Sequence, residues 1–202
     1  MRKMISKAYP SLRNNVDYTS IVNAKQLNRL EGYLDDAREK GAQIIEINPA
    51  SEDLRGSGKI APTLIAGLTD DMQVCQNELF GPILLIHEYD HIDETVEYIN
   101  DRPRPLAMYY FDYNNERAEA LSLRVHSGHF GVNAVLTHVA QDDLPFGGVG
   151  ASGMGKYHGH EGFLTMTHSR SVMIKPKLYA LRMILPPFNK PIHKIMFKAL
   201  LR

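Results

Sequence analysis

The sequence predicts an α/β fold built on a parallel sheet, and two observations carry the prediction. Short apolar runs of strand length alternate with longer segments in which apolar residues recur every three or four positions. Residues 83–89 are strongly apolar, which is typical of a central strand buried on both faces of a parallel sheet. Strands and helices that alternate at this spacing indicate a parallel α/β sheet.

In the N-terminal half, the prediction places one long helix and three strands. Residues 1–18 show no period and are expected to be irregular. A helix is expected at 21–40, with Ser20 as its N-cap, one apolar stripe along its length and Gly41 at its end. No regular element is predicted at 70–77, and the strands are predicted at 42–47, 60–65 and 83–89.

The C-terminal half continues the alternation. Helices are predicted at 92–101 and 114–126, and short strands at 106–111 and 130–133. A glycine-rich segment follows, and one more strand is predicted at 170–174.

The composition of the chain excludes several classes of protein. Its 202 residues suffice for one sizeable domain with a tail, and the net charge of zero gives no indication that nucleic acid is a partner. A single cysteine excludes an internal disulfide framework. No apolar signal-peptide core follows the basic N-terminus, and no run approaches the roughly 18 apolar residues of a membrane span. We therefore expect a cytoplasmic protein.

The glycine-rich segment is the most unusual part of the chain. Seven of the fifteen glycines fall between Gly147 and Gly162. Glycine loses more backbone entropy on ordering than any other residue, so such density is useful only where positive φ or close backbone approach is needed. The large apolar residues that stand among the glycines and can anchor the segment on a core are Leu144, Phe146, Met154, Tyr157 and Phe163. This composition predicts an ordered, functional loop.

Two motif-like strings in the chain lack the context that their chemistry needs. Gly148-x-Gly150-x-x-Gly153 has the spacing of a dinucleotide-binding loop, but no clear strand precedes it and no carboxylate follows about twenty positions later. His87-Glu88-x-x-His91 matches a zinc-peptidase motif, but His87 follows an apolar strand rather than lying on a helix. A zinc peptidase acting through His87 and His91 stays as an alternative, and stoichiometric zinc would support it.

The segment from Glu78 to Pro82 combines a carboxylate and an aromatic ring directly before the most apolar strand. In one interpretation it is a turn that packs Phe80 into the core. In the other, Glu78 accepts hydrogen bonds from ribose hydroxyls and Phe80 holds a flat ring.

Several segments together resemble the aldehyde dehydrogenase family of oxidoreductases. Their order and spacing match the family at 78–82 (Glu-Leu-Phe-Gly-Pro), 105–107, 127–128, 131–133 and 144–159. The segments that look like the coniferyl-aldehyde dehydrogenase branch are 17–20, 48–49 and 53–63. The resemblance extends from about residue 8 almost to the C-terminus.

The resemblance implies roles for four residues. Glu78 would hold the nicotinamide ribose of NAD or NADP, and Phe80 would position the nicotinamide ring. Phe146 would line the aldehyde channel, and Asn133 would support the site. Residues 1–168 would form the C-terminal part of the catalytic domain, 169–175 an oligomerisation strand and 176–202 a basic amphipathic tail.

The family attacks the aldehyde with a cysteine thiolate, and the matched region begins after that cysteine. The glutamate base and the segment that binds the coenzyme phosphates also belong upstream. Without a nucleophile covalent catalysis is lost, so we expect the chain alone neither to oxidise aldehydes nor to bind NAD(P). The alternative from another class is a non-enzymatic assembly module that complements a separate N-terminal half.

Residues 175–202 contain seven lysines and arginines and no acidic residue. The part after Pro187 predicts a short basic amphipathic helix. The resemblance implies a homo-oligomer, so the expected role of this helix is to pack on a partner subunit. Peripheral contact with an anionic membrane is the alternative.

Overall fold

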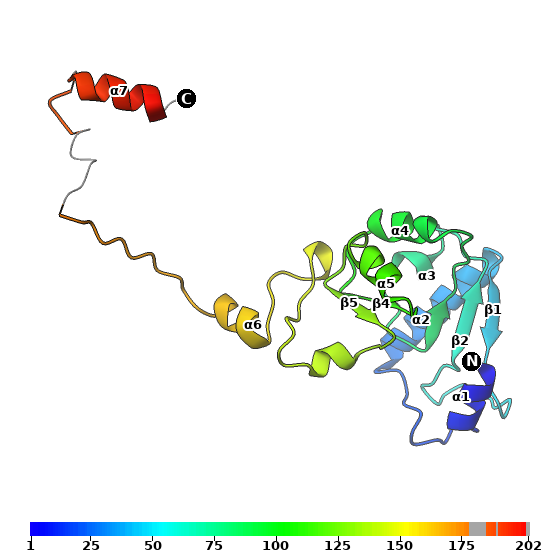
Figure 1. The fold of residues 1–202 in the computed structure, drawn as a ribbon. Coiled ribbons are helices and arrows are strands. Elements are labelled where there is room, and N and C mark those ends of the chain that lie inside the picture. Colours follow the sequence, from blue (N-terminus) through cyan, green and yellow to red (C-terminus); the bar gives the residue numbers. More distant parts are fainter. Residues whose placement is uncertain (178–184, 189, 201–202) are drawn as a thin grey trace. The chain divides into compact units, whose positions relative to one another are not determined.

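A computed structural model describes residues 1–177, 185–188 and 190–200 (Figure 1). The chain divides into two compact units, Met1–Thr95 and Val96–Arg202. Both contain helices and parallel strand pairs, so the predicted α/β class is confirmed. Within the described residues no helix is both long and apolar enough to span a bilayer.

The first unit contains a three-stranded sheet in the order β1-β2-β3. β2 and β3 are parallel, with Thr63 opposite Ile83, whereas β1 runs antiparallel to β2, with Ile44 opposite Ile65. The sheet is therefore mixed rather than purely parallel. The elements of this unit are α1 (Arg2–Ala8), α2 (Ala24–Glu39), β1 (Gln43–Glu46), β2 (Thr63–Ala66), α3 (Gln73–Gln76) and β3 (Ile83–Leu85).

Helix α2 supplies one side of the core of this unit. Its buried residues Leu30, Leu34 and Ala37 lie three or four positions apart, so they form one stripe, which packs with Ile65 of β2 and Ile83 of β3. The predicted N-cap was wrong. Asn23 caps the helix by accepting a hydrogen bond from the N–H of Gln26 at 2.9 Å. The N–H of Ile21 instead donates to the carbonyl of Gly58, so the chain is still outside the helix at that point.

Two expectations about the chain between β2 and residue 89 need correction. A single helical turn, α3, forms where no element was predicted, because its N-terminal N–H donates to the Asp36 carboxylate on α2 at 2.8 Å and the adjacent Met72 and Val74 are buried. The predicted central strand is only the three-residue β3, at the edge of the described sheet, and Leu84 is 48% exposed. The middle strand is β2.

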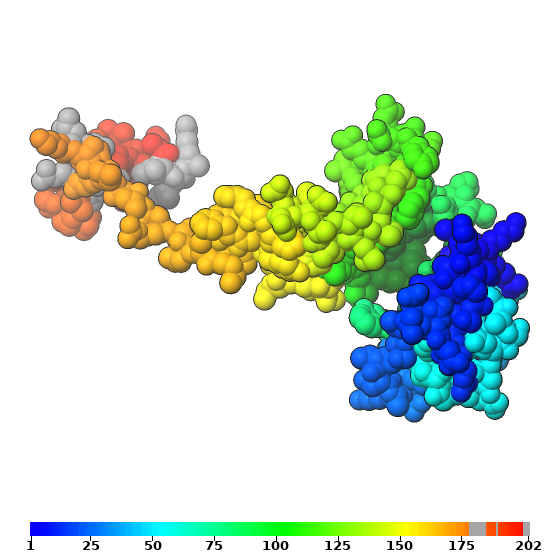
Figure 2. Space-filling model, turned by 90° about the horizontal axis from the view of Figure 1, so that it is seen from below, coloured from blue at the N-terminus to red at the C-terminus, as the bar shows by residue number. Residues whose placement is uncertain are grey.

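The N-terminal lead-in is more ordered than its sequence predicts. It contains α1, and Leu12 and Tyr18 are buried against Ala61. Figure 2 shows this blue segment lying against the cyan segment that follows β1. The Tyr18 hydroxyl donates to the carbonyl of Ile60 at 2.6 Å, and burial raises the pKa of Tyr18 to about 12.

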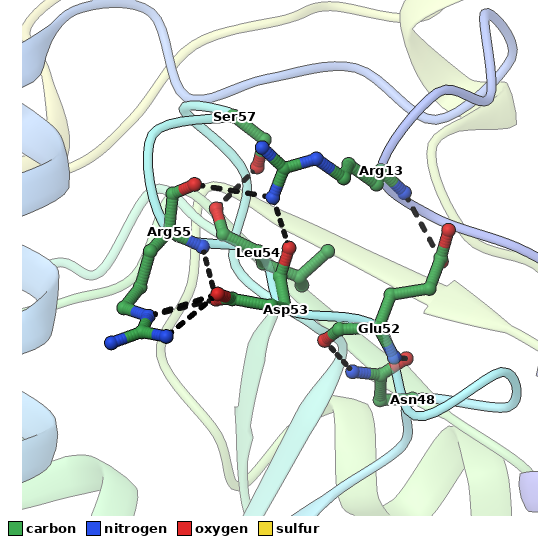
Figure 3. A network of polar contacts seen from close by, with 7 residues as sticks. All are labelled: Arg13, Asn48, Glu52, Asp53, Leu54, Arg55 and Ser57. Atoms are coloured by element: carbon green, nitrogen blue, oxygen red, sulfur yellow. Dashed lines mark hydrogen bonds and ion pairs between the residues drawn. The ribbon is translucent and has the colours of Figure 1, made fainter.

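The loop between β1 and β2 is held by a polar network (Figure 3). Asn48 and Glu52 exchange two hydrogen bonds, of 2.8 Å from the Asn48 amide and 3.1 Å from the Glu52 N–H. The guanidinium of Arg55 pairs with the Asp53 carboxylate at 2.7 Å and holds the pKa of that carboxyl well below its usual range. The Lys59 amino group donates to the carbonyls of Leu12 and Asn15 at 2.9 and 2.7 Å. Through these hydrogen bonds Lys59 joins the N-terminal lead-in to the loop between β1 and β2.

The second unit contains a two-stranded parallel sheet, in which Ala107 of β4 lies opposite His129 of β5. Helix α5 forms the crossover between them, as the predicted alternation requires, and Asn114 caps it through the N–H of Arg117 at 2.9 Å. Its elements are the end of α4 (Ile92–Asn100), β4 (Ala107–Tyr110), α5 (Asn115–Ser122), β5 (His129–Val132), the 3₁₀ turns η1 (Thr137–Ala140) and η2 (Gly150–Ser152), α6 (Gly159–Thr165) and α7 (Pro191–Leu200).

The strand predicted at 170–174 is absent. The residues there have no regular structure, and the side chains of Val172, Met173 and Ile174 are 72%, 76% and 86% exposed. A β-strand needs a hydrogen-bonding neighbour, and no described strand pairs with this segment. The predicted tail helix is confirmed as α7, and residues 178–184, 189 and 201–202 of the tail lie outside the described residues.

Candidate functional site

The Glu78–Pro82 segment connects α3 to β3 in the first unit, and α2 holds its backbone. The guanidinium of Arg29 donates to the carbonyl of Glu78 at 3.0 Å and to that of Leu79 at 2.8 Å. At the other end, the carbonyl of Pro82 accepts from the N–H of Thr63 on β2 at 2.8 Å. The segment is therefore fastened at both ends, although it belongs to neither a helix nor a strand.

Phe80 is presented outward from this fastened segment. Its φ of 49° is in the left-handed region, which is uncommon for a residue with a large side chain, and its side chain is 83% exposed. The interpretation in which Phe80 packs into the core is therefore wrong. Glu78 is also exposed, and no described residue pairs with its carboxylate. An unpaired carboxylate and an exposed ring thus stand two positions apart on one fixed turn.

The glycine-rich loop of the second unit is closed at its base by two backbone hydrogen bonds. The N–H of Phe146 donates to the carbonyl of Tyr157 and the N–H of Tyr157 donates to that of Phe146, both at 2.8 Å. Between them the backbone folds tightly on itself, so a Cβ at Gly147 or Gly148 would overlap the backbone of Gly155 or Ser152. The loop is closed and tightly folded as predicted, but Met154 and Phe163, which were expected to anchor it, are exposed. It is not a dinucleotide-binding loop, because a 3₁₀ turn rather than an α-helix follows Gly148.

A cleft of about 420 Å³ opens beside this loop. Glycine backbone forms much of its wall, and one charged side chain, Lys156, also lines it. Its large apolar and aromatic side chains are Leu106, Phe146, Met154, Tyr157 and Met166. Phe146 is half-buried and its ring meets that of Tyr157 edge-on, with the centroids 5.2 Å apart. This arrangement suits an apolar or aromatic ligand, because aromatic and apolar walls are what such ligands bury against.

Phe146 is also supported by two stacked histidines, one of which belongs to β5. The rings of His129 and His138 lie 3.7 Å apart and nearly parallel, and the ring of Phe146 stacks on that of His138 at 5.6 Å. His138 is only 8% exposed, and neither of its ring nitrogens has a hydrogen-bond partner among the described residues. Burial and, to a smaller extent, the neighbouring His138 lower the pKa of His129. The stack is therefore most stable when the His129 ring is neutral.

Asn133 directly follows β5 with a positive φ of 55°. Its side-chain amide donates to the carbonyl of Asp112 at 2.7 Å. The Asp112 carboxylate is paired with Arg117 at 2.7 Å, which holds the pKa of Asp112 well below its usual range. Within its own unit, Asn133 therefore fastens the end of β5 to the turn before α5.

The predicted site residues fall in both units. Glu78 and Phe80 lie together in the first unit, and Asn133 and Phe146 lie in the second. Sequence reasoning missed Arg29, His129 and His138. The contacts of Arg29 are with residues 49 and 50 positions away, and no local pattern indicates them. Strand pairing brings the ring of His129 on β5 to 6.4 Å from that of Tyr109 on β4, and the ring of His138 on η1 lies 5.8 Å from the same tyrosine, again without a local signal.

The His87-Glu88-x-x-His91 string does not form the geometry of a zinc peptidase. His87 and Glu88 lie outside any helix, and α4 begins only at Ile92. No group of three or more potential ligands capable of holding a metal ion occurs among the described residues. The structure therefore gives this alternative no support.

The sequence profile described as "Aldehyde dehydrogenase family" matches residues 3–172, which is most of the chain. The chain belongs to the aldehyde dehydrogenase family. A probable coniferyl aldehyde dehydrogenase of Pseudomonas aeruginosa is 46% identical over 201 residues, which are 100% of this chain and 41% of that protein. A coniferyl aldehyde dehydrogenase of a Pseudomonas species is 45% identical over 197 residues, which are 96% of this chain and again 41% of that protein. The chain thus spans about two fifths of these aldehyde dehydrogenases.

Solved aldehyde dehydrogenase structures agree with this assignment. The substrate-bound AldH of Staphylococcus aureus superposes with a TM-score of 0.73 at 33% identity, over 99% of this chain and 42% of that one. An aldehyde dehydrogenase of Mycobacterium tuberculosis in complex with NAD+ gives a TM-score of 0.69 at 28% identity, over 80% and 33% of the two chains. The predicted family and its α/β fold are therefore confirmed.

Proposed function

We propose that this chain supplies the nicotinamide-holding and aldehyde-channel parts of an NAD(P)-dependent aldehyde dehydrogenase. The observation that carries the proposal is the fixed turn that presents the unpaired Glu78 carboxylate and the exposed Phe80 ring two positions apart. The reaction is the oxidation of an aldehyde to a carboxylic acid.

Glu78 and Phe80 fit a nicotinamide riboside. An ionised carboxylate only accepts hydrogen bonds, so its two oxygens can accept one from each of the two vicinal hydroxyl groups of a ribose. An aromatic ring two residues away offers a flat apolar surface to the nicotinamide. NAD or NADP would accept the hydride. The role of the chain in that step is to fix the ribose and the face of the ring, which sets the distance over which the hydride moves.

The cleft beside Phe146 supports an aromatic or long-chain aldehyde as the substrate. Apart from Lys156, its large side chains are apolar or aromatic, and both Phe146 and Tyr157 present ring surfaces. Two relatives carry coniferyl aldehyde in their names, and coniferaldehyde is an aromatic aldehyde that would bury its ring in such a cleft.

The nucleophile of the reaction is not assigned to this chain. Its one cysteine, Cys75, is half-buried and packs against the core formed by α2 and the sheet. A free cysteine packed in this way behaves as a small apolar side chain, which suits packing rather than attack on an aldehyde. We therefore expect no aldehyde oxidation by these 202 residues alone.

A second candidate function is that of an assembly module, and exposed apolar side chains of the second unit favour it. Leu136, Phe163, Met166 and Met154 are exposed by 69%, 64%, 87% and 101%. Large apolar side chains exposed to this extent are expected on a face that another protein covers. In this interpretation a separate polypeptide with the nucleophile would bind the chain and complete the enzyme.

One experiment tests both functions. NAD(P)H formation is followed at 340 nm with coniferaldehyde, benzaldehyde and a long-chain aldehyde, using the chain alone and the chain mixed with the N-terminal three fifths of the Pseudomonas aeruginosa relative. We expect no turnover by the chain alone and turnover by the mixture. Glu78→Ala should then raise the KM for NAD(P), whereas Glu88→Ala, an exposed carboxylate outside the turn, serves as the control. Turnover by the purified chain alone would contradict the proposal, and an unchanged KM in Glu78→Ala would remove Glu78 from the cofactor site.

A further inference from the structure

Arg29 makes an unusual set of contacts for an arginine of a surface helix. One terminal nitrogen of its guanidinium donates to the carbonyl of Glu78 at 3.0 Å and the other to the carbonyl of Leu79 at 2.8 Å. Its Nε donates to the side chain of Gln26, one turn earlier on α2, at 2.6 Å, and its Cζ lies 5.1 Å from the ring centre of Tyr33. The guanidinium is thus held on its own helix while it holds two consecutive carbonyls of another segment.

Besides Arg29, the segment is restrained by the packing of Leu79 on the core and by backbone hydrogen bonds to Gly81 and Pro82, which follow Phe80. Glu78, Leu79 and Phe80 belong to no helix or strand, and the backbone adopts a left-handed conformation at Phe80. Such a conformation persists in a residue with a side chain only where the surroundings enforce it. The two Arg29 hydrogen bonds lie immediately before Phe80, so they restrain the part of the backbone that sets the direction of its ring.

Leu30, the next residue of α2, restrains the other side of Phe80. A Cβ at Gly81 would come within 2.6 Å of Leu30 Cδ1, so the backbone at Gly81 lies directly on this fully buried side chain. Two adjacent residues of α2 therefore restrain the segment in different ways. Arg29 donates hydrogen bonds to the carbonyls before Phe80, and Leu30 packs against Gly81 after it.

We propose that Arg29 is a positioning residue that fixes the orientation of Glu78 and Phe80 toward the nicotinamide ribose. The functional part of this inference rests on the proposed function. The planar fork of a guanidinium can serve two adjacent acceptors at once in a fixed geometry, whereas the point charge of lysine cannot reproduce that geometry. Because Arg29 directs its donors to the backbone and to Gln26, it leaves the Glu78 carboxylate available to accept from a ligand.

The positioning itself is tested on the 202-residue chain by backbone ¹⁵N relaxation. In the native chain we expect amide order parameters near the rigid value of about 0.85 at Leu79–Gly81, and in Arg29→Ala a fall below about 0.6 there. Arg29→Lys should give intermediate values. The control is Arg38→Ala on the same helix, whose guanidinium pairs with Asp35 at 2.6 Å, and which should leave the turn rigid. Rigid Leu79–Gly81 amides in Arg29→Ala, or full rescue by lysine, would overturn the inference.

A kinetic arm separates positioning from general structural loss. In the enzyme reassembled with the N-terminal part of a relative, Arg29→Ala should raise the KM for NAD(P) about tenfold or more and leave the KM for the aldehyde within about twofold. Arg38→Ala should change neither. If Glu78→Ala leaves the cofactor KM unchanged while Arg29→Ala loosens the turn, the proposed function fails and the positioning stands. If Arg29→Ala leaves the turn rigid, the positioning fails whatever Glu78 does.

Discussion

The close approach of Gly81 to Leu30 allows a double-mutant prediction with a definite sign. In Gly81→Ala the new methyl group would meet Leu30 Cδ1 at 2.6 Å and Cδ2 at 3.5 Å. The φ of Gly81 is not positive, so the cost comes from the contact rather than from backbone strain. Leu30 is 0% exposed and belongs to the core cluster, so it cannot swing away into solvent.

Two opposing effects set the change in the free energy of unfolding: overpacking lowers it, and the smaller backbone entropy of the unfolded alanine variant raises it. Overfilling a packed core costs about 1–3 kcal/mol, and Gly→Ala at an unstrained position stabilises by about 0.4–1 kcal/mol through the unfolded state. We therefore expect Gly81→Ala to lower the free energy of unfolding by about 1–2 kcal/mol. Leu30→Ala should lower it by about 2–5 kcal/mol, since it opens a cavity. In the Leu30→Ala background the Gly81 methyl enters that cavity, so adding Gly81→Ala there should cost nothing or stabilise slightly.

The assay is urea unfolding followed by NMR signals of the first unit, with Leu30→Val as a milder partner if Leu30→Ala does not fold. Gly32→Ala is the matched control, because Gly32 lies in the middle of the same helix and a Cβ added there would meet no atom within 4 Å. Removing a helix-interior glycine there should stabilise by about 0.5–1 kcal/mol. If Gly81→Ala costs the same in both Leu30 backgrounds, the contact does not carry the effect and the reasoning fails.

Three further predictions concern other parts of the chain. Asn23→Ala should lower the free energy of unfolding by about 1 kcal/mol because α2 loses its cap, whereas Asn28→Ala on the same helix should change it by less than about 0.5 kcal/mol in urea titrations. His129 has a pKa below its usual 6.5 in the folded state, so the unfolded chain binds the proton first as the pH falls. The free energy of unfolding should therefore decrease as the pH drops below about 6.5. His129→Phe should flatten that part of a stability–pH curve, and an unchanged slope would exclude this histidine as the cause. If the tail helix packs on a partner subunit, removal of residues 186–202 should change the sedimentation coefficient of the protein and leave its co-sedimentation with anionic vesicles unchanged; loss of vesicle binding would favour membrane contact instead.

Local patterns predicted the elements whose stability is local. Helix α2 and the crossover between β4 and β5 follow from apolar spacing, since each buries one stripe or one run. α3 was missed because the carboxylate that caps it belongs to Asp36, 37 residues earlier. The strand predicted at 170–174 has the right composition but no described neighbour with which to pair.

The site was predictable in part for the same reason. The Glu-Leu-Phe-Gly-Pro string indicates which residues stand on the turn, but its letters do not indicate that Phe80 faces outward, because that follows from a left-handed backbone held by α2. Likewise, the density of glycines predicts an ordered loop at 147–162, whereas the stacking of His138 between His129 and Phe146 depends on contacts that only the folded chain makes.

The glycine-rich loop has a base held by paired hydrogen bonds and a tip whose side chain is exposed. Two features hold the loop: the hydrogen bonds between Phe146 and Tyr157, and the close backbone approach at Gly147 and Gly148. The exposed side chain of Met154 at the tip can therefore be replaced without disturbing β4 and β5. Met154 is fully exposed, so its side chain adds nothing to the packing of the described chain. Libraries confined to that tip would therefore reshape the mouth of the cleft while the scaffold that supports Phe146 stays in place.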